Sequence, residues 1–143
     1  MPEHRSLNIE QSAKSDRPQK FVFCLLPSFS MLSLCSAVET LCIANTLTKQ
    51  TLYDWTFLGD ETLELTSSIG ISVPVEPSLP HMGSTDALFV CGGANVEQNT
   101  SKMVLGWLRK SARHGASIGG LCTGTYALAK AGLLFEKRAT IHW

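Results

Sequence analysis

The chain has 143 residues, with 12 basic and 12 acidic side chains and a hydrophobic fraction of 44%. This length suits one compact domain and is too short for two of ordinary size. A formal net charge of zero, without a basic patch, argues against nucleic-acid binding by these residues alone. No stretch approaches the roughly 20 apolar residues that span a bilayer, so the sequence predicts no membrane partner.

The first twenty residues differ in composition from the rest of the chain. They contain few large apolar side chains, with Leu7 and Ile9 as the main exceptions, and so lack the apolar core of a secretory signal. We expect residues 1–20 to form a disordered or loosely attached tail and residues 21–143 to form the domain.

The five cysteines, at positions 24, 35, 42, 91 and 122, form no C-x-x-C pair. Zinc is therefore not expected, and no other motif predicts a metal or a cofactor. An odd number of cysteines without an export signal favours the reducing cytoplasm. Cys24, Cys35 and Cys42 are expected to be small buried side chains, and Cys122 alone stands in a context that suggests chemistry.

A continuous apolar run over residues 21–26 ends at Pro27. Continuous rather than alternating hydrophobicity predicts a strand that is buried on both faces, as in a parallel sheet. Ser28 or Ser30 can cap the helix that follows. One stripe of this helix is expected to face the core, formed by Met31, Leu34, Cys35, Val38, Leu41, Cys42 and Asn45.

The middle of the chain alternates between strand and helix patterns. It predicts strands at residues 53–58 and 86–91, a proline-bounded edge strand or extended segment at residues 71–75, and a helix at residues 99–114. Such alternation indicates an α/β fold with an open, mainly parallel sheet and helices on both faces. Folds of this kind place their binding sites at the carboxyl ends of the strands.

The turn around Cys122 is the most informative part of the sequence. An apolar segment at residues 116–118 runs through Gly119 and Gly120 into a helical pattern at residues 125–129. A strand that turns sharply into a helix lifts the turn residue above the sheet, as in a nucleophile elbow. Unpaired N–H groups at the start of a helix favour the thiolate, so Cys122 is the candidate nucleophile.

Several groups are candidates to act with Cys122. The N–H group of Thr123 and one from Gly92-Gly93-Ala94 could hold an oxyanion, and the alternative is that the two glycines only permit a tight turn. His142 follows the elbow in an apolar segment and is the candidate base, with a plain structural role as the alternative.

The first helix contributes two further candidates. Glu39 is its carboxylate, for which a solvated helix position is the alternative interpretation. Ser33, early in the helix, is the residue expected to project toward the elbow, and a serine cannot act as an acid there.

Taken together, these motifs resemble the ThiJ/PfpI family of the class I glutamine amidotransferase-like superfamily. The resemblance covers the chain from about Phe21 to Trp143, and within the family it is greatest to the N-terminal sensor domain of AraC-type transcription regulators. It rests on the first strand with Pro27, residues 37–45, Val90-Cys91-Gly92-Gly93, Gly120-Leu121-Cys122-Thr123-Gly124, residues 131–134 and residues 138–143.

The resemblance implies a flavodoxin-like three-layer sandwich that tends to form homodimers. It also implies that the pocket around Cys122 binds a small nitrogenous metabolite, such as an amino acid or a quaternary amine. In such regulators a C-terminal helix-turn-helix part, not present in this chain, binds the DNA. Members of the family continue past the residues equivalent to His142 with another strand and helix, so the domain is expected to be incomplete at its C-terminus.

Two departures from the family favour a non-catalytic sensor over an enzyme. Enzymatic members carry Asp or Glu where this chain has Ser33, and many peptidase-like members place His where this chain has Thr123. The alternative is a hydrolase, amidase or hydratase in which Cys122 is the nucleophile and His142 or Glu39 moves protons. A further alternative is a redox-responsive protein in which Cys122 is reversibly oxidised.

Overall fold

The computed structural model describes residues 17–83 and 87–142. Most of the tail predicted at residues 1–20 lies outside the described residues. Its last two positions, Gln19 and Lys20, belong to the first strand, β1 (Gln19–Leu25). The folded part therefore begins slightly before the predicted boundary.

Four parallel strands form the central sheet, in the order β2-β1-β5-β6. They are β1, β2 (Tyr53–Leu58), β5 (Ala87–Cys91) and β6 (Ser117–Leu121). The carboxyl-terminal half of β1 and most of β5 are buried, which explains why their sequences are continuously apolar. The strands predicted at residues 21–26, 53–58 and 86–91 are confirmed.

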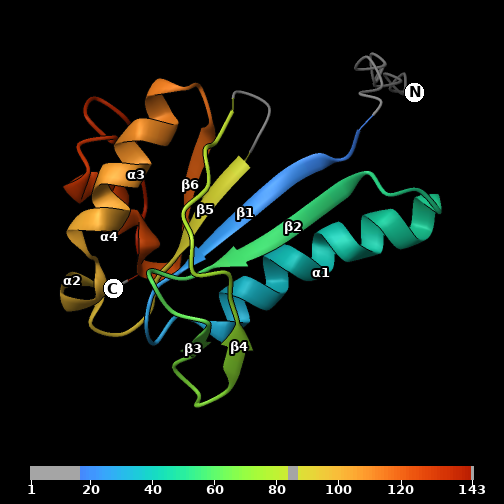
Figure 1. The fold of residues 1–143 in the computed structure, drawn as a ribbon, viewed down its shortest axis with the longest axis horizontal. Coiled ribbons are helices and arrows are strands. Elements are labelled where there is room, and N and C mark those ends of the chain that lie inside the picture. The colour runs from blue at the N-terminus through green and yellow to red at the C-terminus, as the bar shows by residue number, and fades with distance from the viewer. Residues whose placement is uncertain (1–16, 84–86, 143) are drawn as a thin grey trace, which may run out of the picture.

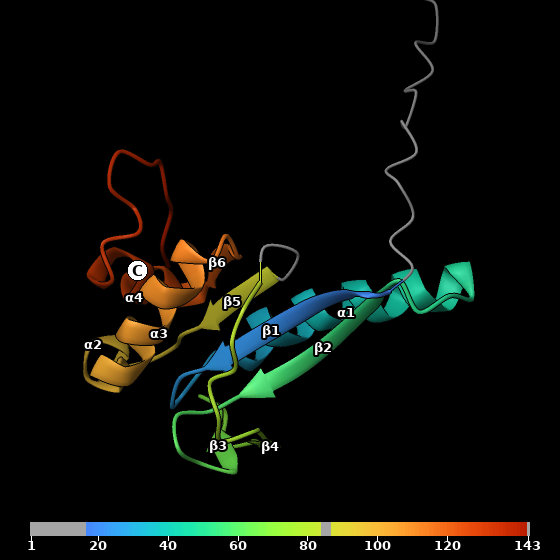
Figure 2. The same cartoon turned by 45° about the horizontal axis from the view of Figure 1, so that its top comes forward.

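Helices cover both faces of this sheet (Figure 1). They are α1 (Met31–Thr48) on one face, and α2 (Val96–Asn99), α3 (Lys102–Arg113) and α4 (Thr125–Lys130) on the other. The turned view shows the same three layers (Figure 2). The predicted α/β architecture with a parallel sheet between two helical layers is confirmed.

Alternate residues of β1 supply the two cores that these layers enclose. Phe23 packs in one buried cluster with Leu34 of α1. Cys24 packs in the other with Leu108 of α3 and Leu128 of α4. Successive strand residues point to opposite faces, so one central strand serves both sides of the sheet.

The side of α1 that faces the sheet is largely the predicted stripe. Leu34 is buried, and Met31, Val38 and Leu41 are partly buried against the same core. Cys35 and Cys42 are exposed, so their predicted burial is wrong, whereas Cys24 is buried as predicted. Apolar residues also lie on the outer side of this helix, and the predicted stripe was therefore too wide.

Among the described residues, α1 is also a helix long and apolar enough to cross a membrane, by length and composition only. The sequence analysis predicts no such stretch, because α1 has 18 residues and includes several polar ones. One helix of this kind is weak evidence for a membrane span. Through Leu34 and its neighbours, α1 forms one layer of the folded domain.

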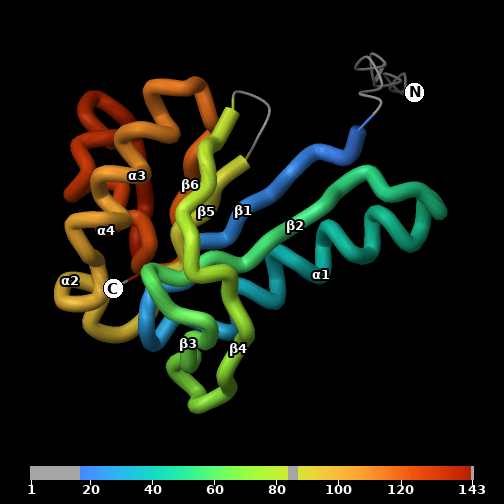
Figure 3. Tube along the Cα trace, in the orientation of Figure 1, coloured from blue at the N-terminus to red at the C-terminus, as the bar shows by residue number. Residues whose placement is uncertain are grey.

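A small antiparallel hairpin lies beside the carboxyl ends of β1 and β2 (Figure 3). It is formed by β3 (Glu64–Thr66) and β4 (Ser72–Pro74), which pair only with each other. Residues 71–75 are therefore not an edge strand of the main sheet. The hairpin is tied to the segment before α1, because Ser28 N–H donates to the Thr66 carbonyl and Ser68 N–H to the Phe29 carbonyl.

The helix predicted at residues 99–114 is confirmed as α3, with slightly shorter bounds. It begins at Lys102 after its N-cap, Ser101, and Asn99 belongs to the separate short helix α2. The Ser101 hydroxyl accepts a 3.1 Å hydrogen bond from Val104 N–H and so fixes the start of α3. Gly115 follows α3 with a φ of 84°, the left-handed conformation that favours glycine directly after a helix.

Candidate functional site

The chain turns sharply at Cys122, between β6 and α4. Strand β6 ends at Leu121, a short 3-10 turn covers Cys122–Gly124, and α4 starts at Thr125. Cys122 has a φ of 55°, in the left-handed region that non-glycine residues seldom adopt. The backbone thus has the predicted elbow form, in which the turn residue is raised at the carboxyl end of the sheet.

Glycines allow the elbow to pack against the neighbouring strand end. A Cβ at Gly124 would collide with the Val90 carbonyl oxygen of β5, and a Cβ at Gly93 would collide with the Ser28 carbonyl oxygen. These contacts involve backbone atoms, which cannot easily move aside. The close approach of the elbow, the turn after β5 and the segment before α1 therefore depends on glycine at these two positions.

Hydrogen bonds join these three segments. The Thr123 hydroxyl donates a 2.8 Å bond to the Gly93 carbonyl. Ser30 N–H donates a 2.9 Å bond to the Gly92 carbonyl, and Gly92 N–H donates a 3.2 Å bond to the Leu121 carbonyl. The elbow is thus bonded to the loop after β5. That loop is bonded to Ser30, the N-cap of α1.

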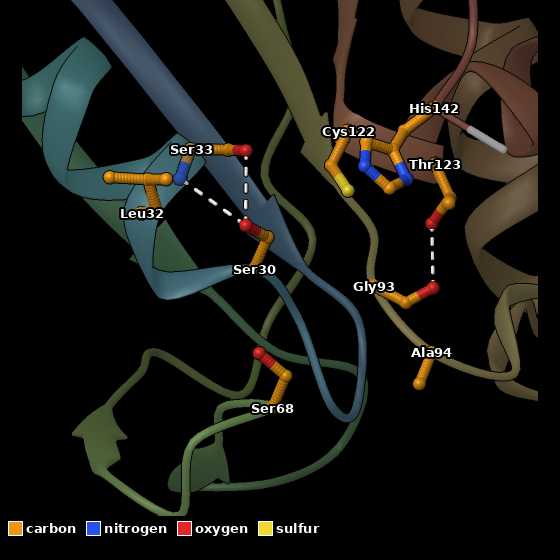
Figure 4. Close-up of a pocket in the computed structure, with 9 residues that line it drawn as sticks. All are labelled: Ser30, Leu32, Ser33, Ser68, Gly93, Ala94, Cys122, Thr123 and His142. Atoms are coloured by element: carbon orange, nitrogen blue, oxygen red, sulfur yellow. Dashed lines mark hydrogen bonds between the residues drawn. The ribbon is translucent and has the colours of Figure 1, made fainter.

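A pocket of about 380 Å³ opens between these segments (Figure 4). This is within the size range of small-ligand sites. Its walls come from the start of α1, the β3–β4 hairpin, the turn after β5, the elbow and the C-terminal segment. The residues that line it are Ser30, Leu32, Ser33, Ser68, Gly93, Ala94, Cys122, Thr123 and His142.

The polar groups of this lining are mainly hydroxyls. Ser30 and Ser33 lie on the α1 wall, where their hydroxyls are 3.0 Å apart, and Ser68 comes from the hairpin. Cys122 and His142 form the opposite wall (Figure 4). The backbone N–H of His142 donates a 3.4 Å bond to the Cys122 carbonyl. The described lining residues include no Asp, Glu, Lys or Arg.

The structure brings most of the predicted site residues together. Cys122, Thr123, Gly93, Ser33 and His142 all line this one pocket. These residues lie close together because the carboxyl ends of parallel strands are at the same edge of the sheet.

Two other candidates stand apart from that lining. Gly92 lies behind the pocket wall, where a Cβ would be 2.5 Å from the Thr123 hydroxyl oxygen. Glu39 is exposed on α1 and does not line the pocket, so its solvated-helix interpretation is the correct one.

Sequence reasoning missed three lining residues: Ser30, Leu32 and Ser68. Ser30 was identified only as a possible helix cap, and it is the N-cap of α1. Ala94, named with Gly92-Gly93 as a possible source of an oxyanion N–H group, does line the pocket. Ser68 reaches the pocket through hairpin contacts distant in sequence, for which the sequence carries no signal.

Two buried thiols lie behind the site and differ chemically from Cys122. Burial, and to a smaller extent Asp60, raises the pKa of Cys24 to about 12. Burial, followed by the neighbouring Cys24 and Cys122, raises the pKa of Cys91 well above its usual range. Neither thiol is a nucleophile in the folded protein, because each stays protonated and enclosed.

Known proteins are similar to this chain in sequence. The sequence model of the DJ-1/PfpI family matches residues 28–143. The chain is 35% identical over 126 residues to the HTH-type transcriptional regulator GbdR of Pseudomonas aeruginosa, covering 88% of this chain and 34% of GbdR. It is 40% identical over 125 residues to CdhR, another HTH-type transcriptional regulator of that organism, covering 87% of this chain and 37% of CdhR.

A solved structure shows the same fold. An AraC family transcriptional regulator from Pseudomonas putida superposes with a TM-score of 0.77 at 31% identity, over 87% of this chain and 67% of that one. The chain spans about a third of the length of the curated regulators it matches. The family match covers the first helix, the turn after β5 and the elbow, which are the segments that build the pocket. The chain therefore belongs to the DJ-1/PfpI family.

Proposed function

We propose that this domain is a non-catalytic small-molecule sensor of an AraC-type transcription regulator, and that its ligand binds in the Cys122 pocket. One observation carries the proposal: the elbow opens on a pocket whose facing wall presents Ser33 instead of a carboxylate. A thiol nucleophile needs a partner that moves its proton, and a serine hydroxyl does not supply one. The relatives named above are regulators, which agrees with this function.

The proposed ligand is a small nitrogenous metabolite. The lining residues indicate which chemical group of this ligand lies inside the pocket. Apart from His142, the described lining has no aromatic ring, and it has no carboxylate. A quaternary amine is ordinarily held by an aromatic cage, which is lacking here. The hydroxyls of Ser30, Ser33 and Ser68, with the N–H groups of Gly93 and Thr123, suit a carboxylate or carbonyl group. The nitrogen would then point toward the mouth.

Signalling requires that the bound ligand favours one of two conformations or assembly states. We propose that DNA is bound by a separate helix-turn-helix part of a longer polypeptide and that the domain works in the cytoplasm. Within the described chain, Ser30 connects the pocket to α1 as its N-cap. Ligand contact at Ser30 or Ser33 would therefore act directly on the start of α1.

We also propose a homodimer that uses the outer side of α1. This side exposes Leu32, Ile43 and Leu47, and Glu39 is the one charged residue of the helix. An exposed side with this many apolar residues is ordinarily covered, and a second copy related by a two-fold axis would cover it with the same side of its own helix. Light scattering on a size-exclusion column should report a dimer.

Two matched variants test the dimer. Ile43→Glu on α1 should give a monomer, whereas Met103→Glu on α3, at a similarly exposed position, should leave the dimer intact. A monomeric wild-type chain, or equal effects of the two variants, would contradict this assembly.

Calorimetric titration with amino acids and quaternary amines tests the sensor function. We expect saturable binding of one compound class that Ser33→Val weakens at least tenfold. Ser36→Val is the matched control, because Ser36 is exposed on the same helix and does not line the pocket. Binding that is insensitive to Ser33→Val would place the ligand elsewhere.

The enzyme alternative has one observation in its favour, because His142 lines the same pocket as Cys122. In that case Cys122 attacks a carbonyl or isocyanide carbon, and the N–H groups of Thr123 and Gly93 stabilise the developing charge. Turnover of small amides, aldehydes or isocyanides, abolished in Cys122→Ser, would establish it. Ligand binding without turnover in the wild-type protein would support the sensor.

A further inference from the structure

A pair of histidines lies outside the Cys122 pocket. The ring centroids of His81 and His114 are 4.4 Å apart, with the ring planes at 72°, and both residues are exposed. We propose that these two imidazoles bind a divalent transition-metal ion of the zinc, nickel and copper class, with water in the remaining positions. These metals share a preference for imidazole nitrogen. The sensor function above is not needed for this proposal.

The tautomer of His114 leaves a nitrogen available for a metal ion. Its Nδ1 lies 2.7 Å from the Lys110 carbonyl oxygen. A carbonyl only accepts, so Nδ1–H is the donor and Nε2 of the neutral ring carries the free lone pair. Metal-binding histidines commonly donate their other N–H to a carbonyl in this way, which fixes the ring orientation.

The ring separation matches two ligands of one ion. With a metal–nitrogen distance of about 2.0–2.1 Å, each ring centroid lies roughly 3.2 Å from the ion, so the centroids are roughly 4.5 Å apart when the two metal–nitrogen bonds meet at a right angle, as in octahedral or square-planar coordination. The observed 4.4 Å is close to this value.

His81 is also held in place from both sides. The preceding carbonyl, of Pro80, accepts a 2.7 Å hydrogen bond from Trp107 Nε1–H of α3. The following residue, Met82, is 2% exposed in the core. These anchors keep the segment against α3. Metal binding therefore costs little conformational entropy, because His81 already lies next to His114.

Charges near the two histidines have opposing effects on the affinity for a metal ion. His114 is the C-cap of α3, where the carbonyl ends of the helix favour a positive charge. Lys110 and Arg113 in the last turn oppose it. Among the described residues no cluster of three or more potential ligands is found. We therefore expect the two histidines to bind the ion reversibly, with a dissociation constant in the micromolar range. The two histidines are 33 positions apart in sequence, a spacing without a metal motif.

Nickel titration followed by calorimetry tests the site. The full chain should carry Cys35→Ser, Cys42→Ser and Cys122→Ser, because these accessible thiols could themselves bind nickel. We expect one nickel site whose affinity falls at least tenfold in His81→Gln and in His114→Gln. Lys110→Gln should tighten binding about twofold or more, because it removes a neighbouring charge and keeps the backbone carbonyl.

Nuclear magnetic resonance provides a readout without substitutions at the site. Substoichiometric nickel should broaden the ring signals of His81 and His114 before those of His142. Unchanged affinity in both histidine variants, or first broadening at His142, would overturn the proposal.

Discussion

The hydroxyl of Thr123 donates a 2.8 Å hydrogen bond to the carbonyl of Gly93, a residue 30 positions earlier in the chain. This bond joins the residue after the elbow cysteine to the turn after β5. Because both residues line the pocket, the bond fixes the distance between two of its walls. It also occupies the Thr123 hydroxyl, so Thr123 offers a ligand its backbone N–H.

Loss of this bond should loosen the pocket. Thr123→Val keeps the shape of the side chain and removes the donor, leaving a partly buried carbonyl without this partner. We expect the free energy of unfolding to fall by about 1 kcal/mol in urea denaturation. Thr123→Ser retains the hydroxyl and should stay close to wild type; an equal loss in both variants would contradict a stabilising role of this bond, because serine keeps the donor.

Gly124 should tolerate no side chain. A Cβ there would collide with the Val90 carbonyl, so Gly124→Ala should separate the elbow from β5 and cost several kcal/mol, measured by thermal unfolding. Gly106→Ala is the control, because Gly106 lies in α3 with no atom within 4 Å of its added Cβ. This second change should stabilise the protein by about 0.5–1 kcal/mol through helix propensity.

Asn45 attaches the end of α1 to the start of β2. Its side-chain amide donates a 2.8 Å bond to the Tyr53 carbonyl, and its oxygen accepts bonds of 2.8 Å from Leu52 N–H and 3.0 Å from Tyr53 N–H. Asn45→Ala should lower the free energy of unfolding by about 2 kcal/mol. Thr46→Ala, which removes only a bond within the helix, should change it by less than about 0.5 kcal/mol.

The buried thiols should make the fold sensitive to alkaline pH. Folding raises the pKa of Cys24 from 9.0 to about 12, so the unfolded chain loses this proton first. The stabilisation is therefore complete below pH 9 and declines as pH rises toward the folded pKa, by about 1.4 kcal/mol per pH unit for each such thiol. Urea denaturation between pH 8 and 10.5 measures this slope.

Two alanine variants separate this effect from other titrations. Cys24→Ala should flatten the decline above pH 9, because one of the titrating thiols is gone. Cys35→Ala should leave it unchanged, since Cys35 is exposed in the folded chain. Parallel pH curves for the two variants would contradict the assignment to Cys24.

The sequence predicted the sheet because its central strands are buried on both faces. Runs such as residues 21–26 and 86–91 have no polar interruption, and the confirmed strands lie there. The inner side of α1 was predicted only in part, because apolar residues also lie on its outer side. Met31, Leu34, Val38 and Leu41 pack against the core as predicted, whereas Cys35 and Cys42 are exposed.

The candidate site was predictable where its geometry is local. Glycines and a cysteine at a strand-to-helix junction indicate an elbow, and Cys122 has the strained backbone that such a turn requires. Ser68 could not be found from sequence, because it reaches the pocket through pairing of the hairpin with the segment before α1. Contacts of that kind depend on the tertiary fold.

Alkylation of Cys122 in the presence of ligand tests the central claim most directly. The rates of iodoacetamide labelling at Cys122, Cys35 and Cys42 can be followed by mass spectrometry, with and without a metabolite that binds in calorimetry. Because Cys122 lines the pocket and the other two thiols are exposed on α1, bound metabolite should slow labelling of Cys122 at least tenfold and leave the other two rates unchanged. Undiminished labelling of Cys122 at saturating metabolite, or turnover of that metabolite, would contradict a sensor that binds its ligand at this elbow.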